Sequence, residues 1–315
     1  MKIINEGSVK VNITNLRLDC VAWIKDQFDK KFPTAKAVLG ISGGKDSTVA
    51  AALCVDALGK DRVVGLILPN GEQHDKDMAY EVCEYLGIEH YEINIKDITS
   101  AMYSKLSEHV EVSEQSKINM PARIRTAMIM YFAQSVNGIM INTCNLSEDL
   151  VGYSTLFGDD LGSLAPLKEL TVTEIIAIGE DMLLPDKFTH KIPSDGLCGK
   201  TDEDNIGLKY VDIDIMVRSI GFNSANIETI NEIIECDYDK FKDECLIVAY
   251  VFDKLIEYGD LGHDSFNDFK TLLRKYRANK FKTEIIKIPS FPVPYWSDKY
   301  FQHLEKYLYN SYLGI

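Results

Sequence analysis

The N-terminal half of the chain alternates short, continuous apolar runs with longer stretches whose apolar residues recur at helical spacing. Runs such as 37–41 and 63–68 are typical of strands that are buried on both faces. The first amphipathic stretch ends near Phe32-Pro33, because proline stops a helix. Later stretches predict helices over 46–58, 73–86, 97–109 and 121–136, and the runs predict strands over 37–41, 63–68, 91–95 and 139–142. We therefore expect an α/β protein with a doubly wound parallel sheet.

The second half of the sequence is mainly helical in pattern. It predicts helices over 238–258 and 266–278 and near 297–312. We expect residues 1–220 to form the main domain and residues 221–315 to form a C-terminal helical extension packed on it. Two stretches are predicted as connections, the polar segment 111–118 and the long loop 185–205. Because loops of this length are usually functional or disordered, we interpret the second as a lid that substrate orders.

The stretch from Gly40 to Ser47 reads Gly-Ile-Ser-Gly-Gly-Lys-Asp-Ser and joins a predicted strand to a predicted helix. At such a junction the unpaired N–H groups of the helix start and the helix dipole bind phosphate. Gly43 and Gly44 let the backbone approach an anion closely, and Ser42 and Ser47 add hydroxyl donors. An ordinary glycine turn in a βαβ unit is the alternative, but the full string favours a site for the phosphates of a nucleotide.

Asp46 distinguishes this loop from a Walker loop, whose Gly-x-x-x-x-Gly-Lys-Ser/Thr spacing is absent here. A carboxylate beside phosphates is repulsive unless a cation lies between them. Asp46 therefore indicates Mg²⁺ bound to pyrophosphate oxygens, and cleavage of a nucleoside triphosphate between its α- and β-phosphates.

This loop resembles the pyrophosphate loop of the N-type ATP pyrophosphatases, a superfamily that includes GMP, asparagine and argininosuccinate synthetases and tRNA-thiolation enzymes. Three further segments resemble, in order and spacing, the motifs of one branch, the NAD⁺ synthetases: Asn119–Arg125, Asn142–Glu148 and Val151–Asp159. The stretch Pro193–Gly207 resembles the loop and helix start that cover the nucleotide in that branch. Four motifs in register make the resemblance far more specific than the loop alone.

The resemblance implies an ammonia-dependent NAD⁺ synthetase with an adenine nucleotide α-hydrolase-like sheet. A carboxylate does not exchange its oxygen for nitrogen at neutral pH, because oxide is a very poor leaving group. The expected enzyme therefore uses ATP to convert the carboxylate of deamido-NAD⁺ into an acyl-adenylate, with release of pyrophosphate. Ammonia then displaces AMP and gives NAD⁺. Mg²⁺ and backbone donors stabilise the negative charge that develops in both steps.

The resemblance also assigns roles to individual residues. Asp46 and Ser47 are the catalytic candidates, and Asp46 and Glu148 are the candidate magnesium ligands. The candidate contacts to deamido-NAD⁺ are Arg123, Tyr153 and Lys280. The candidate contacts to ATP are Gly40, Ser42, Gly43, Gly44, Asp46, Ser47, Thr143 and Ser194. From the residues alone, helix capping and turn roles stay open for Thr143 and Ser194, and a surface salt bridge stays open for Arg123.

Three positions depart from the family motifs. Leu156 and Val172 stand where many relatives have lysine, and Ser163 stands where they have aspartate. Because those positions contact the substrates in better-known members, two alternatives stay open. The first alternative is another adenylating amidase or thiolase of the same superfamily. The second is an inactive nucleotide-binding homologue. Lys168 is the neighbouring cation that can replace a missing charge, and Arg125 is a weaker substrate contact than Arg123 because it points to another helix face.

The net charge and the distribution of apolar residues argue against some classes of binding partner. A formal charge of −14 opposes binding to a nucleic-acid backbone. No apolar run approaches about 18 residues, and the N-terminus lacks the apolar core of a signal peptide. We therefore expect a cytoplasmic protein with no nucleic-acid or membrane partner. The 7 cysteines include no Cys-x-x-Cys pair and the 6 histidines no i, i+4 pair, so neither a disulfide frame nor a zinc site is predicted.

The nitrogen donor and the oligomeric state are also expectations. The residues before the first predicted strand are too few for a glutaminase domain, so free ammonia is the expected donor unless a partner subunit delivers it. The resemblance implies a homodimer whose dinucleotide site lies across the interface. The first helix and the apolar run Met128–Phe132 offer surface for such contact, although core packing explains the run equally well.

Overall fold

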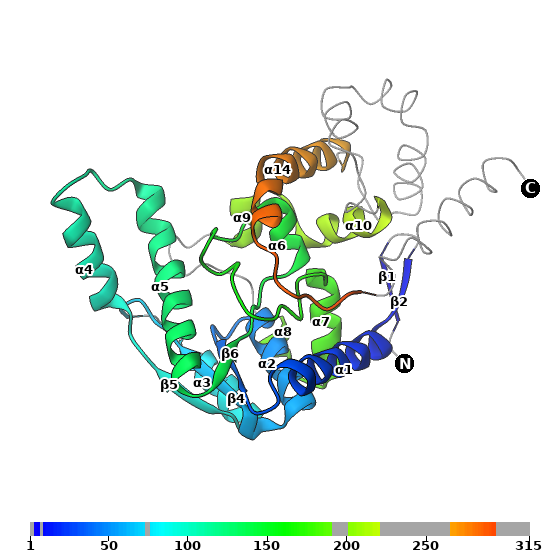
Figure 1. Ribbon diagram of the computed structural model, residues 1–315. Coiled ribbons are helices and arrows are strands. Elements are labelled where there is room, and N and C mark those ends of the chain that lie inside the picture. Colours follow the sequence, from blue (N-terminus) through cyan, green and yellow to red (C-terminus); the bar gives the residue numbers. More distant parts are fainter. Residues whose placement is uncertain (1–2, 7–8, 73–75, 191–200, 221–264, 294–315) are drawn as a thin grey trace, which may run out of the picture.

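The computed structural model describes residues 3–6, 9–72, 76–190, 201–220 and 265–293. A four-stranded parallel sheet lies at the centre of these residues (Figure 1). Its hydrogen-bonded order is β5-β4-β3-β6, and the strands are β3 (Lys36–Gly40), β4 (Val63–Ile67), β5 (Glu89–Glu92) and β6 (Gly138–Met140). The parallel pairing confirms the predicted fold class.

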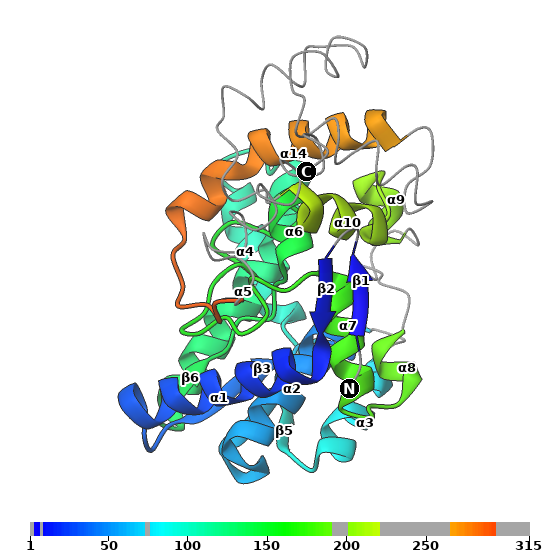
Figure 2. The same cartoon turned by 90° about the vertical axis from the view of Figure 1, so that its right-hand side faces the viewer.

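Helices cover both faces of this sheet because its central strands are apolar on both sides. Ala37 and Leu39 of β3 belong to one buried cluster, and Val38 between them belongs to the other. The first cluster includes α1 (Ile13–Lys31), α2 (Lys45–Leu58), α3 (Lys76–Leu86), α7 (Val172–Asp181) and α8 (Asp186–Thr189). The second includes α5 (Glu114–Ser135). The result is a three-layered core (Figure 2).

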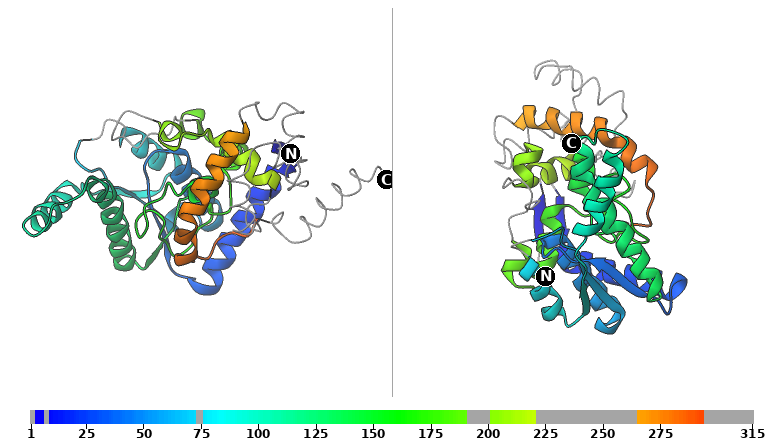
Figure 3. Two further views of the ribbon diagram at one scale, coloured as in Figure 1. Left: turned by 90° about the horizontal axis from the view of Figure 1, so that it is seen from above. Right: turned by 90° about the vertical axis from the view of Figure 1, so that its left-hand side faces the viewer.

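The remaining elements lie around this core. They are the hairpin β1 (Ile3–Glu6) and β2 (Val9–Asn12), the short helix η1 (Lys60–Arg62), and the helices α4 (Lys96–Ser107), α6 (Leu146–Val151), α9 (Asp202–Ile206), α10 (Tyr210–Ile220) and α14 (Ser265–Ile285). Helix α14 crosses above α6 and α10 (Figure 3). Among the described residues, no helix combines the length and apolarity needed to cross a bilayer.

Most predicted elements of the sheet domain are confirmed, with shifted ends. The polar connection at 111–118 is wrong from residue 114 onward, because α5 begins at Glu114. Ser113 caps this helix by accepting a hydrogen bond from the Ser116 amide (3.3 Å), so the helix continues through Pro121. The hairpin of β1 and β2 has no counterpart in the prediction, since four-residue strands are too short for alternation to reveal.

Some predictions concern segments outside the described residues. These are the helices at 238–258 and 297–312 and residues 191–200 of the expected lid. The described flanks of that loop form α8 and α9. The helix expected at 266–278 is confirmed and extends over Ser265–Ile285. The domain boundary at residue 220 stays a prediction.

The order of the strands places the site. From β3 the chain first builds outward through β4 to β5, and then returns to place β6 on the opposite side of β3. Ligands of open α/β sheets bind where this reversal occurs, outside the carboxyl ends of the strands. The end of β3 at Gly40 and the end of β6 at Met140 lie on the two sides of that reversal.

Candidate active site

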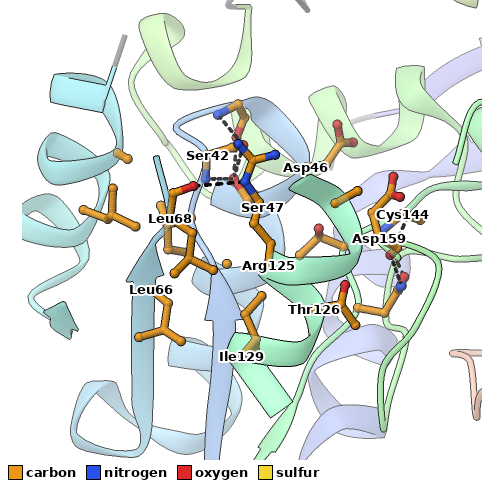
Figure 4. A pocket seen from close by; sticks show the side chains of 18 of the residues that line it. Ser42, Asp46, Ser47, Leu66, Leu68, Arg125, Thr126, Ile129, Cys144 and Asp159 are labelled. Carbon is orange, nitrogen blue, oxygen red and sulfur yellow. Dashed lines mark hydrogen bonds between the residues drawn. The ribbon is translucent and has the colours of Figure 1, made fainter. Parts of the chain in front are cut away.

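A cavity of about 410 Å³ lies at the carboxyl ends of β3, β4 and β6 (Figure 4). Its wall comes from the glycine loop, the end of β4, one face of α5 and the segment after β6. Seven of the residues predicted from sequence line it: Gly40, Ser42, Gly44, Asp46, Ser47, Thr143 and Glu148. Segments that are far apart in the sequence therefore meet as the resemblance implies.

Short hydrogen bonds hold the glycine loop in shape. The Ser42 amide donates to Ser47 Oγ (3.2 Å), and the Gly44 amide donates to Ser42 Oγ (3.2 Å). Gly44 is the N-cap of α2 and has no side chain to satisfy the first amides of the helix. Lys45, Asp46 and Ser47, which form that first turn, all line the cavity. An uncapped helix start beside a cavity is a ready binding site for an anion such as phosphate.

Gly43 is outside the lining but shapes the loop. Its φ of +76° lies in the left-handed region that favours glycine. A Cβ added there would lie 2.8 Å from the Ala79 backbone nitrogen of α3. The glycine is therefore needed for two reasons, its conformation and the close approach of α3.

Asn145 joins the two predicted magnesium ligands. Its Nδ2 donates to Asp46 Oδ1 (3.2 Å), and its Oδ1 accepts from the Glu148 amide (2.9 Å). Its own amide donates to Glu148 Oε2 (3.4 Å), which completes a capping box at the start of α6. Helix capping thus orients Glu148, and the same asparagine binds Asp46.

The electrostatics of this pair are those of a site that needs a cation. Removal from water, followed by repulsion from Asp46, raises the pKa of Glu148 well above its usual value. Lys45 lies beside them, with Nζ 2.9 Å from Asp46 Oδ2. Burial alone lowers the pKa of this ammonium, but attraction from Asp46 and Glu148 outweighs burial and raises it. Lys45 was not among the candidate residues predicted from sequence.

The two arginines of the α5 motif are placed differently from expectation. Arg125 lines the cavity and its Nε donates to the Leu68 carbonyl (2.9 Å), so its side chain extends from α5 toward the glycine loop (Figure 4). Burial lowers the pKa of Arg125. Arg123 is exposed, lies outside the lining, and donates to the Leu156 carbonyl (3.2 Å). The role of Arg123 toward deamido-NAD⁺ stays a prediction.

Three other predicted contacts lie outside the cavity lining or the described residues. Tyr153 donates its hydroxyl to Asp202 Oδ1 (2.9 Å), and Asp202 does line the cavity. Lys280 is on α14 and does not line it. Its neighbour Lys282 binds the Gly152 and Ser154 carbonyls at 2.7 and 2.9 Å instead. Ser194 lies outside the described residues.

At the three departures from the family motifs, the hydrogen bonds involve backbone atoms, so they do not depend on which side chain stands there. The Leu156 carbonyl accepts from Arg123, the Ser163 amide donates to the Met140 carbonyl (2.8 Å), and the Val172 amide donates to Ser147 Oγ (3.1 Å). Lys168 does not replace a missing charge in the cavity, because its Nζ binds the buried Asp149 carboxylate at 2.5 Å.

Sequence signals for some missed residues were present. The run Asn145-Leu-Ser-Glu148 is an Asn-x-x-Glu capping box, which marks Asn145 as a helix cap. Thr201 and Asp204 form the same kind of box at the start of α9, which places Asp202 at the cavity. No comparable signal distinguishes Arg125 from Arg123, because both belong to the same motif.

The chain matches a known protein family over most of its length. The model of the family described as NAD synthase matches residues 17–245 of the chain. The chain belongs to the NAD synthase family. Its glycine loop, the cavity-lining part of α5 and the α6 segment all lie within the matched range.

Relatives in the NAD synthase family include two archaeal proteins, each named NH₃-dependent NAD⁺ synthetase. The one from Pyrococcus furiosus is 37% identical over 209 residues, which are 66% of this chain and 80% of that protein. The one from Methanocaldococcus jannaschii is 39% identical over 187 residues, which are 58% of this chain and 71% of that protein.

Solved structures also match. An NMN synthetase from Francisella tularensis is 26% identical with a TM-score of 0.67, covering 89% of this chain and 99% of its own. An NH₃-dependent NAD synthetase from Campylobacter jejuni is 24% identical with a TM-score of 0.63, covering 88% and 99%, and shows a shared fold.

Within the NAD synthase site, the donor set fits a metal ion that is shared with a substrate. Among the described residues, no group of three or more His, Cys, Asp or Glu side chains is arranged to hold a metal alone. Asp46 and Glu148 supply two carboxylates beside a phosphate-binding loop. Mg²⁺ is commonly bound by one or two carboxylates together with substrate phosphates, so these residues suit it.

Proposed function

We propose that this protein catalyses the ATP-dependent amidation of deamido-NAD⁺ to NAD⁺ with ammonia as the nitrogen donor. One observation carries the proposal. A single cavity combines the uncapped start of α2 with the Asp46 and Glu148 carboxylates, which Asn145 holds together. The names of the archaeal relatives support the choice of ammonia and of the dinucleotide product.

The reaction has two steps that balance. An oxygen of the nicotinate carboxylate attacks the α-phosphorus of ATP, the bond to the β-phosphate oxygen breaks, and pyrophosphate leaves. Ammonia then attacks the acyl carbon, loses a proton, and displaces AMP. The products are the amide, AMP and pyrophosphate.

The residues of the cavity divide this work. The first amides of α2 and the hydroxyls of Ser42 and Ser47 bind the phosphates. Asp46 and Glu148 are the residues that would hold Mg²⁺, which supplies Lewis-acid stabilisation of phosphate charge when bound. Arg125 adds a guanidinium to the same cavity, where it is placed to bind a phosphate or ribose oxygen of ATP.

A turnover assay tests the proposal. Purified protein with ATP, Mg²⁺, ammonium and deamido-NAD⁺ is expected to give NAD⁺, AMP and pyrophosphate in equal amounts, and Asp46→Ala is expected to abolish all three. ADP among the products in place of AMP, or full magnesium-dependent turnover by Asp46→Ala, would overturn it.

The same assay separates the other members of this chemistry. The Francisella protein is an NMN synthetase, so nicotinate mononucleotide is the second acid to supply, and faster formation of NMN than of NAD⁺ would change the substrate. Release of pyrophosphate only with a different acid would indicate another adenylating enzyme. No turnover with any acid, while ATP still binds, would indicate an inactive homologue.

We also propose that the protein is a homodimer. Met130 and Tyr131 of α5 are 48% and 74% exposed, so part of the apolar run on α5 is not core. Helix α4 and the start of α5 project from the body as a two-helix arm (Figure 1). Its large exposed apolar residues are Ile98, Met102, Tyr103, Leu106 and Ile118. Apolar surface of this extent is typical of a protein contact.

A further inference from the structure

Lys45 is in an unusual position for a lysine. It is the first residue of α2, where the helix dipole disfavours a positive charge, and it is only 4% exposed. A buried charge is costly unless it is paired. Its Nζ is 2.9 Å from Asp46 Oδ2 and 5.3 Å from the ring centroid of Tyr210 on α10. The pairing offsets the cost, and it also uses one oxygen of a carboxylate that a metal would need.

Lys45 is also the cation that the acidic groups of the site share. Asp46, Glu148 and Asp202 all act on its charge, and all three line the cavity. The other described cations of the lining have other partners in the structure. Lys76 pairs with Glu92 at 3.3 Å, and Arg125 donates to the Leu68 carbonyl.

Tyr210 is the aromatic neighbour of Lys45 and is not itself part of the cavity lining. Its residue is 4% exposed, and within the described part of the chain its hydroxyl has no hydrogen-bond partner. Glu148, Asp202 and Asp46 act on it electrostatically. The acidic groups that act on Lys45 therefore also act on its neighbour, so the surroundings of Lys45 are strongly negative.

We propose that Lys45 is the counter-ion of the phosphate site. Its ammonium group neutralises the charge of Asp46 before ligands bind, and it moves from Asp46 to phosphate oxygens when the metal and nucleotide bind. The proposal rests on the proposed function, because it takes Asp46 and Glu148 as metal ligands. It identifies Lys45 as a further substrate-contacting residue, with the Tyr210 ring as its support on α10.

Competition for Asp46 makes this testable. An ammonium and a divalent cation compete for Asp46 Oδ2 and repel each other, so Lys45 weakens binding of the bare metal. Once phosphates are present, the ammonium has other oxygens to bind and contributes to nucleotide affinity. Loss of the charge is therefore expected to move the two affinities in opposite directions, which a purely structural role does not predict.

The first measurement uses Mn²⁺ alone, followed by electron paramagnetic resonance without nucleotide. Lys45→Gln and Lys45→Met are expected to bind Mn²⁺ roughly tenfold more tightly than the wild type, which is within the usual range of coupling between sites. Lys45→Arg keeps the charge and is expected to bind like the wild type. Lys36→Gln removes one charge from the opposite end of β3, where Lys36 pairs with Glu89, and is the matched control with unchanged Mn²⁺ affinity.

The second measurement is ATP affinity in the presence of Mg²⁺, which is expected to fall about tenfold in Lys45→Gln and to recover in Lys45→Arg. Unchanged or weaker Mn²⁺ binding by the neutral variants would overturn the proposal. Neither measurement needs the acid substrate. The proposal for Lys45 can therefore fail while amidation of deamido-NAD⁺ is confirmed, and it can hold while that amidation is not found.

Should the neutral variants not fold, lysine acylation of the wild type gives the answer by mass spectrometry. Mn²⁺ is expected to raise the reactivity of Lys45 by releasing it from Asp46, and Mn²⁺ with pyrophosphate is expected to suppress it. Reactivity that does not respond to Mn²⁺ would contradict the exchange.

Discussion

At the scale of single residues, the glycine loop depends on one backbone conformation. Gly43 and Gly207 both have positive φ, +76° and +74°. They differ in their surroundings, because a Cβ at Gly43 would lie 2.8 Å from the Ala79 nitrogen, whereas a Cβ at Gly207 meets nothing within 4 Å. The two glycines therefore allow the cost of the positive φ to be separated from the cost of the contact.

We predict that Gly43→Ala lowers the free energy of unfolding by more than Gly207→Ala does. A positive φ costs an alanine about 1 kcal/mol, and the contact with α3 adds to this cost only at Gly43. Urea unfolding measures the difference, and a nucleotide titration is expected to show weaker ATP binding for Gly43→Ala alone. Equal losses of stability and equal ATP affinities would contradict the role given to the contact.

The two arginines of α5 give a second residue-scale prediction. Arg125→Gln is expected to raise the Kd for ATP roughly tenfold, because it removes a charged donor from the cavity wall. Arg123→Gln is expected to leave ATP affinity unchanged, because Arg123 is outside the lining. Isothermal titration with ATP checks both. A larger effect on ATP affinity at Arg123 than at Arg125 would contradict the placement of Arg125 in the ATP site.

The motifs brought single residues together correctly where they fixed the position: Asp46, Thr143 and Glu148 all line the cavity, and their roles stay predictions. The sequence favoured Arg123 over Arg125, whereas Arg125 is the one that lines the cavity. Residues two apart on a helix face different ways, and only the packed position of α5 decides which way is inward. Lys45 was missed because a lysine beside an aspartate in a sequence gives no sign that both are enclosed.

At the scale of elements, α14 is fixed to the segment that follows α6. Asn279 donates to the Val151 carbonyl (3.2 Å), and Lys282 binds the Gly152 and Ser154 carbonyls. The Val151 and Gly152 carbonyls belong to the C-terminal end of α6, where a cation is favourable, and Ser154 follows that end. A Cβ at Gly152 would lie 1.9 Å from Asn279 Cγ, so this contact also requires glycine.

We predict that Gly152→Ala costs roughly 2–4 kcal/mol of stability and loosens α14, because the methyl group overlaps Asn279. Gly207→Ala is the control, since Gly207 ends α9 with a similar φ of +74° but meets nothing within 4 Å. Its expected cost is only about 1 kcal/mol. Hydrogen exchange in α14 and thermal unfolding measure the two effects, and equal costs would contradict the overlap.

Elements could be predicted from sequence where apolar periodicity was strong, as in α1 and β4. Their ends could not, because capping decides them. The start of α5 depends on the bond from the Ser116 amide to Ser113, which outweighs the signals of a polar segment and an internal proline. The position of α14 depends on carbonyls at the end of a helix that lies far away in the sequence.

At the scale of the whole molecule, Arg17 joins three helices. Its Nε binds Asp181 of α7 at 2.7 Å, and its Nη1 binds Asp56 of α2 at 3.2 Å. Burial alone raises the pKa of Asp181, but hydrogen bonds from Arg17 and Thr14 outweigh it and lower that pKa below its usual value. A carboxyl with a lowered pKa stabilises the fold above its unfolded value, and this stabilisation is lost as the pH falls through the folded value.

We predict that Asp181→Asn lowers the free energy of unfolding by about 1–2 kcal/mol at neutral pH. The difference from the wild type is expected to shrink below about pH 4 and to vanish once the pH is below the lowered pKa of the folded carboxyl, because the wild-type carboxyl is then neutral in both states. Urea unfolding between pH 7 and 3 measures it. Asp29→Asn, which breaks the exposed pair with Lys25 on α1, is the control with no expected change. A difference that grows with acidity would contradict the prediction.

The homodimer is a prediction at the same scale. Sedimentation at micromolar concentration is expected to give a dimer, because the arm of α4 and α5 and the outer face of α5 expose large apolar side chains. The double variant Met102→Glu, Tyr131→Lys is expected to shift the protein toward monomer. Its melting temperature is expected to fall only by the amount that loss of the dimer interface explains. A wild-type monomer would remove the support for a site shared between subunits.

The fold class followed from the alternation of strands and helices, and the relation to known proteins followed from four motifs in register. The strand order did not follow from either, since alternation is compatible with several orders of a parallel sheet. The return of the chain to the far side of β3 is what brings β6, and with it Asn145 and Glu148, to the glycine loop.

Glu148 has two duties with one carboxylate. It completes the first turn of α6 through the Asn145 amide, and it faces the cavity where an ion is expected. Local melting of that short helix, well below the global transition, would therefore withdraw a ligand as well as a cap. Affinity for a divalent ion would then decline on warming before the protein unfolds. Binding of the ion would therefore depend on whether one helical turn is intact.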